Sequence, residues 1–366
     1  MKIMHIVGNR PQFIKLAPVS RKMRKHGIEE TIVHTGQHYD GNMSEIFFEE
    51  LGIPYPKVNL NVGSDTHAQL TARIISGLER IVIEERPDGV VIYGDTNSTL
   101  AAAIVVSKLN ITLFHIEAGP RTYNRANPEE KNRIVADHLA DYLFAPDKIS
   151  VENLKKEGIQ DDQIIFSGDV MYDAFLYSVS HCDDHLDKKH PKDFILMTWH
   201  REENTCSKER MERMLSFVAS INCKVVLPLH PRTAKMLSEF NLWEKIRANK
   251  NLMVMEPVGY KEMTFLLSRC KFVISDSGGV SKEASFAGKR CFFPLRLEVW
   301  PELIEAGYIH IVDLENEESV QESVSMARAM LDKEALPLKK AGFFGDGNAA
   351  EIIVNTIEKV LREKNP

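Results

Sequence analysis

Short apolar and β-branched runs alternate with longer amphipathic stretches over most of the chain. The short runs have the length of buried strands, and the longer stretches repeat their apolar residues at helical spacing. A first series of expected strands covers residues 2–8, 30–36, 89–94, 112–118, 141–146 and 164–168. A second series covers residues 194–200, 224–230, 252–258, 271–278, 289–295 and 309–313. Helical patterns lie between them, for example at residues 66–86, 209–221 and 261–270. This alternation predicts parallel sheets covered by helices on both faces.

A polar stretch at residues 181–193 separates the two series. It contains a proline and lacks periodicity, which is typical of a linker between domains. We therefore expect an α/β protein with two Rossmann-like, doubly wound domains. The first covers residues 1–178 and is joined by a C-terminal helix at 349–366, and the second covers residues 179–348. Because such sheets bind ligands at the carboxyl ends of their strands, we expect an active-site cleft lined by strand ends of both domains.

Charge and composition exclude several classes of partner. The 366 residues carry a formal net charge of −6, so the chain lacks the basic footprint of a nucleic-acid-binding protein. No apolar run approaches the roughly 20 residues of a membrane-spanning helix. The N-terminal sequence lacks the features of a signal peptide, so we expect a cytoplasmic protein. The five cysteines form no C-x-x-C pair, and we expect neither a disulfide framework nor a zinc site.

Two junctions between a strand and a helix suit an anionic ligand. In SDSGGV, Ser277, Gly278 and Gly279 would bring backbone N–H groups and a helix N-terminus to a phosphate or diphosphate. Glu283, one turn further, could accept hydrogen bonds from a ribose. In GNRPQFIK, Arg10 and Lys15 offer two cations, and the absence of G-x-G-x-x-G argues against a nicotinamide site. The alternatives are a serine-capped turn at the first junction and solvent-facing cations at the second.

Other predicted strand ends carry ionisable groups. Asp95 follows a buried strand, His230 follows another, and His200 and Arg201 follow a third. Each has a structural alternative: a helix cap for Asp95, a hydrogen-bonded structural histidine for His230, and a charged surface loop for the other two. Independent caps would not place such residues at so many strand ends, so we interpret the set as one site.

Residues 115–133 hold three acids within fourteen residues. Glu117 ends a predicted strand and Glu129 begins the next helix, so one loop joins these two acids. We expect Glu130 to have a structural role, paired with an arginine or capping the helix.

Taken together, these residues resemble the non-hydrolysing UDP-N-acetylglucosamine 2-epimerases, a family built like GT-B glycosyltransferases. The matching stretches follow the family's order over residues 1 to about 310. They are GNRPQFIK (8–15), TGQH (35–38), YGDTNST (93–99), HIEAGPRTYN (115–124), PEEKNR (128–133), FAP (144–146), SGDVMYD (167–173), HREEN (200–204), LPLHPRT (227–233), EPVGY (256–260) and DSGGVSKEA (276–284). Residues 34–53 and GDVMYD look closest to members that act on modified sugars, including UDP-2,3-diacetamido-glucuronate 2-epimerases.

The resemblance implies inversion at C2 of a UDP-sugar by elimination and re-addition of UDP, in a homodimer, without a nicotinamide cofactor or a catalytic metal. The residues that match the family's catalytic positions are Asp95, Glu117, Glu129 and His230. The residues that match its substrate-binding positions, or that lie beside them at strand ends, are Arg10, Lys15, Asn132, Arg133, His200, Arg201, Ser277, Gly278, Gly279, Glu283 and Arg296.

Three departures from the family pattern stand out. Pro120 replaces the usual leucine of G-L-R, the stretch 295–302 is one residue short and lacks the usual Thr-Glu, and residues 39–41 replace a motif tied to allosteric activation. The alternatives in function are a hydrolysing epimerase, a GT-B glycosyltransferase and an inactive nucleotide-sugar-binding protein. A Rossmann dehydrogenase is disfavoured by the missing glycine fingerprint.

Overall fold

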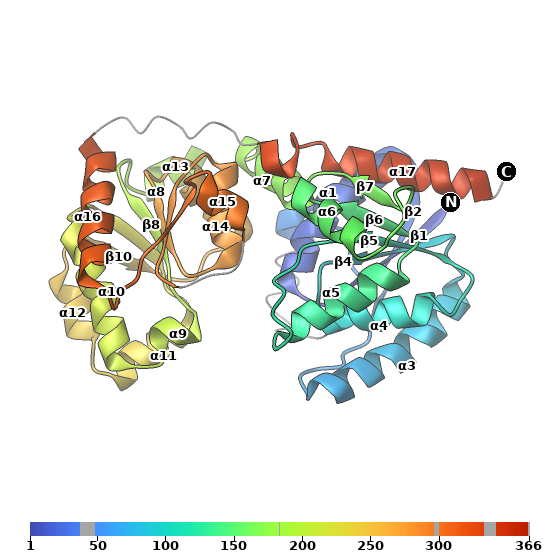
Figure 1. Ribbon diagram of the computed structural model, residues 1–366, viewed down its shortest axis with the longest axis horizontal. Coiled ribbons are helices and arrows are strands. Elements are labelled where there is room, and N and C mark those ends of the chain that lie inside the picture. Colours follow the sequence, from blue (N-terminus) through green and yellow to red (C-terminus); the bar gives the residue numbers. More distant parts are fainter. Residues whose placement is uncertain (37–47, 183, 296–299, 333–341, 365–366) are drawn as a thin grey trace. The chain divides into compact units, whose positions relative to one another are not determined.

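The computed structural model describes residues 1–36, 48–182, 184–295, 300–332 and 342–364. The chain forms two compact units, each built around its own parallel sheet (Figure 1). One unit is Met1–Leu176 with Gly342–Pro366, and the other is Tyr177–Ala341. The chain passes from the first unit to the second inside helix α7 (Val170–Ser180).

The first unit contains a seven-stranded parallel sheet with the order β3-β2-β1-β4-β5-β6-β7. Its strands are β1 (Lys2–Val7), β2 (Glu29–His34), β3 (Val58–Asn59), β4 (Gly89–Tyr93), β5 (Thr112–Ile116), β6 (Tyr142–Ala145) and β7 (Ile164–Phe166). Its helices include α1 (Arg10–Lys25), α3 (His67–Glu85), α4 (Asn97–Val106), α5 (Pro128–Leu139), α6 (Lys148–Lys156) and α17 (Ala349–Lys364).

Two apolar layers enclose this sheet. On one face, α3, α4 and α5 bury side chains such as Ile74, Ala102 and Ala136 against the strands. Helix α17 packs against α1 (Figure 1). Its Leu361 side chain lies beside Gly89 of β4. The C-terminal helix therefore completes the core of the unit that the N-terminal strands begin.

The second unit contains a six-stranded parallel sheet with the order β10-β9-β8-β11-β12-β13. Its strands are β8 (Ile195–Thr198), β9 (Val225–Pro228), β10 (Leu252–Met255), β11 (Val273–Ser275), β12 (Cys291–Phe293) and β13 (Ile309–Ile311). Its helices are α8 (Asp184–Lys189), α9 (Glu202–Thr205), α10 (Lys208–Ile221), α11 (Pro231–Glu239), α12 (Trp243–Ala248), α13 (Tyr260–Arg269), α14 (Gly278–Phe286), α15 (Pro301–Glu305) and α16 (Glu317–Asp332).

Both sheets have the doubly wound strand order that the sequence predicted. The order reverses between β1 and β4 in the first unit and between β8 and β11 in the second. In open α/β sheets, ligands bind beside the carboxyl ends of the strands at such a reversal. Every strand expected from the sequence is present. Strand β3 and the short helix α8, inside the polar stretch 181–193, were not predicted.

Candidate active site

Buried Gln12 joins the two strand ends at the reversal point of the first sheet. It lies in the first turn of α1 and is 1% exposed. Its Oε1 accepts a hydrogen bond from Gly8 N at 2.6 Å, and its Nε2 donates to Tyr93 O at 2.7 Å and to Thr99 Oγ1 at 3.0 Å. Because these contacts come from both strand ends, Gln12 fixes the end of β1 relative to the end of β4.

Lys15 and Glu117 form an ion pair at this edge of the sheet. Lys15 comes from α1, and Glu117 directly follows β5 in a left-handed conformation with φ +65°. The backbone of Gly94 passes beside the pair, and a Cβ there would lie 3.0 Å from Lys15 Nζ and 3.1 Å from Glu117 Oε2. Gly94 also has φ +59°, so both its conformation and its surroundings require glycine.

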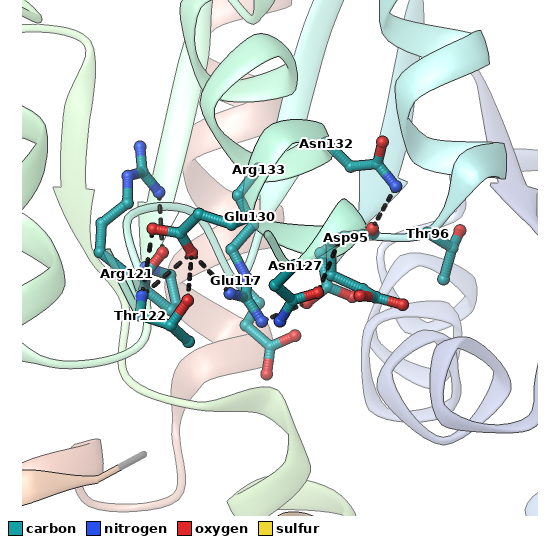
Figure 2. Close-up of polar contacts among 12 residues, drawn as sticks. Asp95, Thr96, Glu117, Arg121, Thr122, Asn127, Glu130, Asn132 and Arg133 are labelled. Carbon is teal, nitrogen blue, oxygen red and sulfur yellow. Dashed lines mark hydrogen bonds and ion pairs between the residues drawn. The ribbon is translucent and has the colours of Figure 1, made fainter. Parts of the chain in front are cut away.

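A second pair lies at the end of the neighbouring strand. The guanidinium of Arg133, from α5, lies between two carboxylates (Figure 2). Its Nη2 contacts Asp95 Oδ2 at 2.6 Å, and its Nη1 donates to Glu130 Oε2 at 2.9 Å. Asn132 Nδ2 donates to the backbone oxygen of Asp95 at 2.9 Å. Burial disfavours the charged form of Arg133, but the charges of Asp95 and Glu130 outweigh burial and raise its pKa.

Glu130 holds the loop that follows Glu117. Its buried carboxylate accepts hydrogen bonds from Thr122 N at 3.0 Å and from Tyr123 N at 2.8 Å (Figure 2). Burial alone would raise the pKa of Glu130, but these bonds and the contact with Arg133 lower it. Glu130 therefore stays ionised and anchors the loop.

Glu129 and Arg10 are exposed at the starts of their helices. Glu129 lies in the first turn of α5, where Asn127 Oδ1 accepts a hydrogen bond from its backbone N–H at 3.0 Å. Arg10 is the first residue of α1. These contacts connect Lys15 with Glu117 and Asp95 with Arg133.

In the second unit, the DSGG segment caps α14. Ser277 Oγ accepts a hydrogen bond from Val280 N at 3.4 Å, and Gly278 and Gly279 form the first turn. Glu283 is 6% exposed on the same helix. Trp300 donates from Nε1 to Gly278 O at 3.2 Å, so the indole fixes the backbone of this turn. Arg296 lies outside the described residues.

Asp276 joins the two strand ends at the reversal point of the second sheet. It is fully buried and accepts hydrogen bonds from His200 N at 3.1 Å, Arg201 N at 3.0 Å and Asn204 Nδ2 at 3.2 Å. The ring of His200 also approaches it, with Nδ1 3.2 Å from Oδ1. The carboxylate therefore holds the loop after β8 against the start of the DSGG turn.

His230 lies beside His200. It is the N-cap of α11, where its Nδ1 accepts a hydrogen bond from Arg232 N at 3.1 Å. The centroids of the His200 and His230 rings are 5.4 Å apart. Partial burial, followed by the charges of His200 and Arg232, lowers the pKa of His230. Because Nδ1 accepts a hydrogen bond, the neutral ring carries its proton on Nε2.

Several residues that hold these strand ends in place were not predicted from the sequence. Gln12, His115, Asp137 and Asp276 are all buried and polar at or beside strand ends. Asp276 had a visible signal, because it is an acid at the end of a strand next to Ser277. Within the described ranges, no group of three or more histidines, cysteines or acids could hold a metal ion. The same residues contain no helix long and apolar enough to cross a membrane.

Comparison with known proteins identifies the family. The family model described as UDP-N-acetylglucosamine 2-epimerase matches residues 21–358. The chain is 43% identical over 366 residues to a Methanococcus maripaludis protein named UDP-N-acetylglucosamine 2-epimerase homolog, covering 98% of this chain and 100% of the relative. It is 40% identical over 367 residues to UDP-2,3-diacetamido-2,3-dideoxy-D-glucuronate 2-epimerase of Pseudomonas aeruginosa, covering 98% and 100%.

A solved structure supports the same assignment. The crystal structure of Methanocaldococcus jannaschii UDP-GlcNAc 2-epimerase in complex with UDP-GlcNAc and UDP matches with a TM-score of 0.84 at 38% identity, covering 98% of this chain and 100% of that chain. The predicted fold class, two Rossmann-like halves of the GT-B type, is confirmed, as is the resemblance inferred from the motifs. The chain belongs to the UDP-N-acetylglucosamine 2-epimerase family.

Proposed function

We propose that this protein inverts the configuration at C2 of a UDP-2-acetamido sugar. A base removes the C2 proton, the C1–O bond breaks, and its electron pair leaves with UDP, so that a 2-acetamidoglucal remains. UDP then adds back at C1 while an acid protonates C2 from the opposite face. The atoms balance without a redox cofactor or a metal. Family membership and the names of the matched relatives support this reaction.

The observation that carries the proposal is the pair of carboxylates, Asp95 and Glu117, that follow neighbouring strands and each contact a cation. Two faces of a sugar need two proton-handling groups. Carboxylates also stabilise the positive charge that develops on the sugar when the C1–O bond breaks. We assign Asp95, Glu117 and exposed Glu129 to proton transfer and charge stabilisation, with Asn132 and Arg133 beside the sugar.

The nucleotide would bind mainly to the second unit. The first turn of α14 presents N–H groups and a helix dipole to the diphosphate, and buried Glu283 would accept the ribose hydroxyls. The residues that we assign to this part of the substrate are Arg10, Lys15, Arg201, Ser277, Gly278, Gly279, Glu283 and Arg296.

His230 would help UDP to leave. His200, which we assign to substrate binding, lies beside His230, and Asp276 orients its ring through a 3.2 Å contact between Oδ1 and Nδ1. His230 has a lowered pKa and would act as a neutral donor through Nε2.

Proton NMR of UDP-N-acetylglucosamine with the pure protein in D2O tests the proposal. The expected result is a signal of UDP-N-acetylmannosamine with deuterium at C2 and no free sugar. The diacetamido-glucuronate nucleotide is the second substrate to test, because the Pseudomonas relative is named for it. Free N-acetylmannosamine with UDP would instead identify a hydrolysing enzyme. Transfer of the sugar to an added acceptor would identify a glycosyltransferase, and no reaction with either sugar would contradict an active epimerase.

The family resemblance also supports three further proposals. We propose that residues 1–178 with 349–366 and residues 179–348 are separate domains, and that the enzyme is a homodimer. We further propose a cytoplasmic enzyme that supplies sugars for polysaccharides of the cell envelope. Sedimentation of the pure protein would test the dimer, since a single species at the monomer mass of 41.6 kDa would contradict it.

A further inference from the structure

A buried imidazole lies between the backbones that carry the two proposed acids. His115, the fourth residue of β5, is fully buried. Its Nε2 lies 2.8 Å from the carbonyl oxygen of Gly94, and its Nδ1 lies 2.7 Å from Asp137 Oδ1 on α5. Gly94 directly precedes Asp95, and His115 lies two residues before Glu117. The ring therefore touches both segments of chain that lead to the acids.

The chemistry of these partners fixes the role of each ring nitrogen. A carbonyl oxygen can only accept, so Nε2 carries a proton and donates it to Gly94. Asp137 is fully buried and also receives Arg121 Nη2 at 2.7 Å and Gly119 N at 3.1 Å. Burial would raise the pKa of Asp137, but His115 and Arg121 lower it, so the group accepts as a carboxylate. Each nitrogen of His115 therefore faces an acceptor, Asp137 Oδ1 at Nδ1 and Gly94 O at Nε2.

The surrounding contacts make this linkage rigid. Gly94 N donates to Ile116 O at 2.9 Å, and Gly94 O accepts from the His115 ring. Residues of β5 therefore bind both the N–H and the carbonyl of Gly94. Asp137 binds residues on both sides of Glu117, namely His115 before it and Gly119 after it. His115 and Asp137 thus hold together the two segments of chain that carry Asp95 and Glu117.

We propose that His115 and Asp137 form a positioning dyad that fixes Asp95 relative to Glu117 for the C2 proton transfers. The dyad touches no substrate. It sets the separation of the two carboxylates by holding the Gly94 carbonyl on one side and the Glu117 loop on the other. This inference rests on the proposed epimerase function.

Two substitutions of His115 test its hydrogen bond to Gly94 separately from its hydrogen bond to Asp137. In His115→Gln, the side-chain amide nitrogen can take the place of Nε2 and still donate to Gly94 O. In His115→Asn, the amide nitrogen takes the place of Nδ1, keeps Asp137 and cannot reach Gly94. Misplacing a catalytic group by about 1 Å can cost on the order of 100-fold in rate. We therefore expect His115→Asn to lower kcat about 100-fold and His115→Gln to lower it less than about tenfold, with KM within about twofold of wild type for both.

The control is His26→Asn, which removes a histidine contact to Glu358 at 3.0 Å on the α1–α17 surface of the same unit. It should keep the wild-type kcat. Equal kcat values for His115→Asn and His115→Gln, or a wild-type kcat in His115→Asn, would overturn the proposal.

A measurement on the wild-type protein covers the case in which the variants do not fold. In a 15N-histidine NMR spectrum at neutral pH, His115 should show a proton on Nε2 that exchanges slowly with solvent. An unprotonated Nε2 would overturn the proposal whatever the activity. If wild-type protein epimerises no UDP-sugar, the proposed function fails, whereas this spectrum still reports on the hydrogen bond.

Discussion

The ammonium of Lys15 and the carboxylate of Glu117 pair beside the Cα of Gly94, although the two residues lie 102 positions apart in the sequence. Their side chains are 9% and 14% exposed, so each charge is largely removed from water and depends on the other. The pair therefore ties α1 to the end of β5 and holds the Glu117 carboxylate beside a cation.

Glu117→Gln should keep nucleotide binding and lose turnover. Glutamine has the same shape but cannot exchange a proton, and general acid–base groups typically contribute a factor of about 10²–10⁴. We expect kcat to fall by about that factor, while the Kd for UDP stays within about twofold. Deuterium incorporation at C2 and titration calorimetry with UDP measure the two effects. Glu84→Gln, at an exposed position on α3, is the control. A wild-type kcat in Glu117→Gln would remove this residue from the catalytic set.

Gly94→Ala should disturb the same ion pair sterically. The added Cβ would lie 3.0 Å from Lys15 Nζ at a backbone position with φ +59°. Gly27→Ala is a matched control, because Gly27 has φ +70° but no atom within 4 Å of the added Cβ. Both variants should lose about 1–2 kcal/mol of stability from the left-handed backbone. Only Gly94→Ala should also lose kcat, by about tenfold or more. Urea unfolding and the NMR assay separate the two effects, and equal kcat values would contradict the steric argument.

Asp276→Asn should weaken nucleotide binding. The amide that replaces one carboxylate oxygen would face the N–H groups of His200 and Arg201, so at least one donor loses its acceptor. Removing one partner from a buried charged network costs about 3–5 kcal/mol of stability. The Kd for UDP should rise about tenfold or more because the loop at His200 loosens. Asp193→Asn, whose side chain is 82% exposed beside Lys271, should leave both quantities unchanged. An unchanged Kd in Asp276→Asn would show that the loop does not depend on this carboxylate.

Glu30→Gln should change how stability depends on pH. Burial raises the pKa of Glu30 to about 7, although hydrogen bonding from Ser20 and the charge of Arg24 lower it. A raised carboxyl pKa means that the stabilising contribution is complete below about pH 4.5 and is lost as the pH rises through 7. The variant lacks this loss, so its stability relative to wild type should increase by about 2 kcal/mol between pH 5 and pH 8. Urea unfolding at both pH values measures the difference. A constant difference, as expected for Glu84→Gln, would contradict the raised pKa.

The sequence predicted the sheets well because their strands are buried on both faces, which leaves continuous apolar runs such as that of β4. It missed β3, since two residues carry no periodicity, and α8, since its residues are nearly all polar. It also placed the candidate acids correctly at strand ends. The partners of these acids depend on which strands are neighbours. Asp276 meets His200 only because β8 and β11 are adjacent, and this relation is not local in the sequence.

At Glu117, the left-handed backbone favours glycine, whereas the proposed proton transfer requires a carboxylate. A residue with a Cβ is disfavoured there by about 1–2 kcal/mol, and glycine would remove that strain together with the carboxylate. Selection for stability alone would therefore favour glycine over glutamate at this position. Under the proposed role of Glu117, we expect a related protein with glycine at this position to keep the fold and to lack the epimerase reaction.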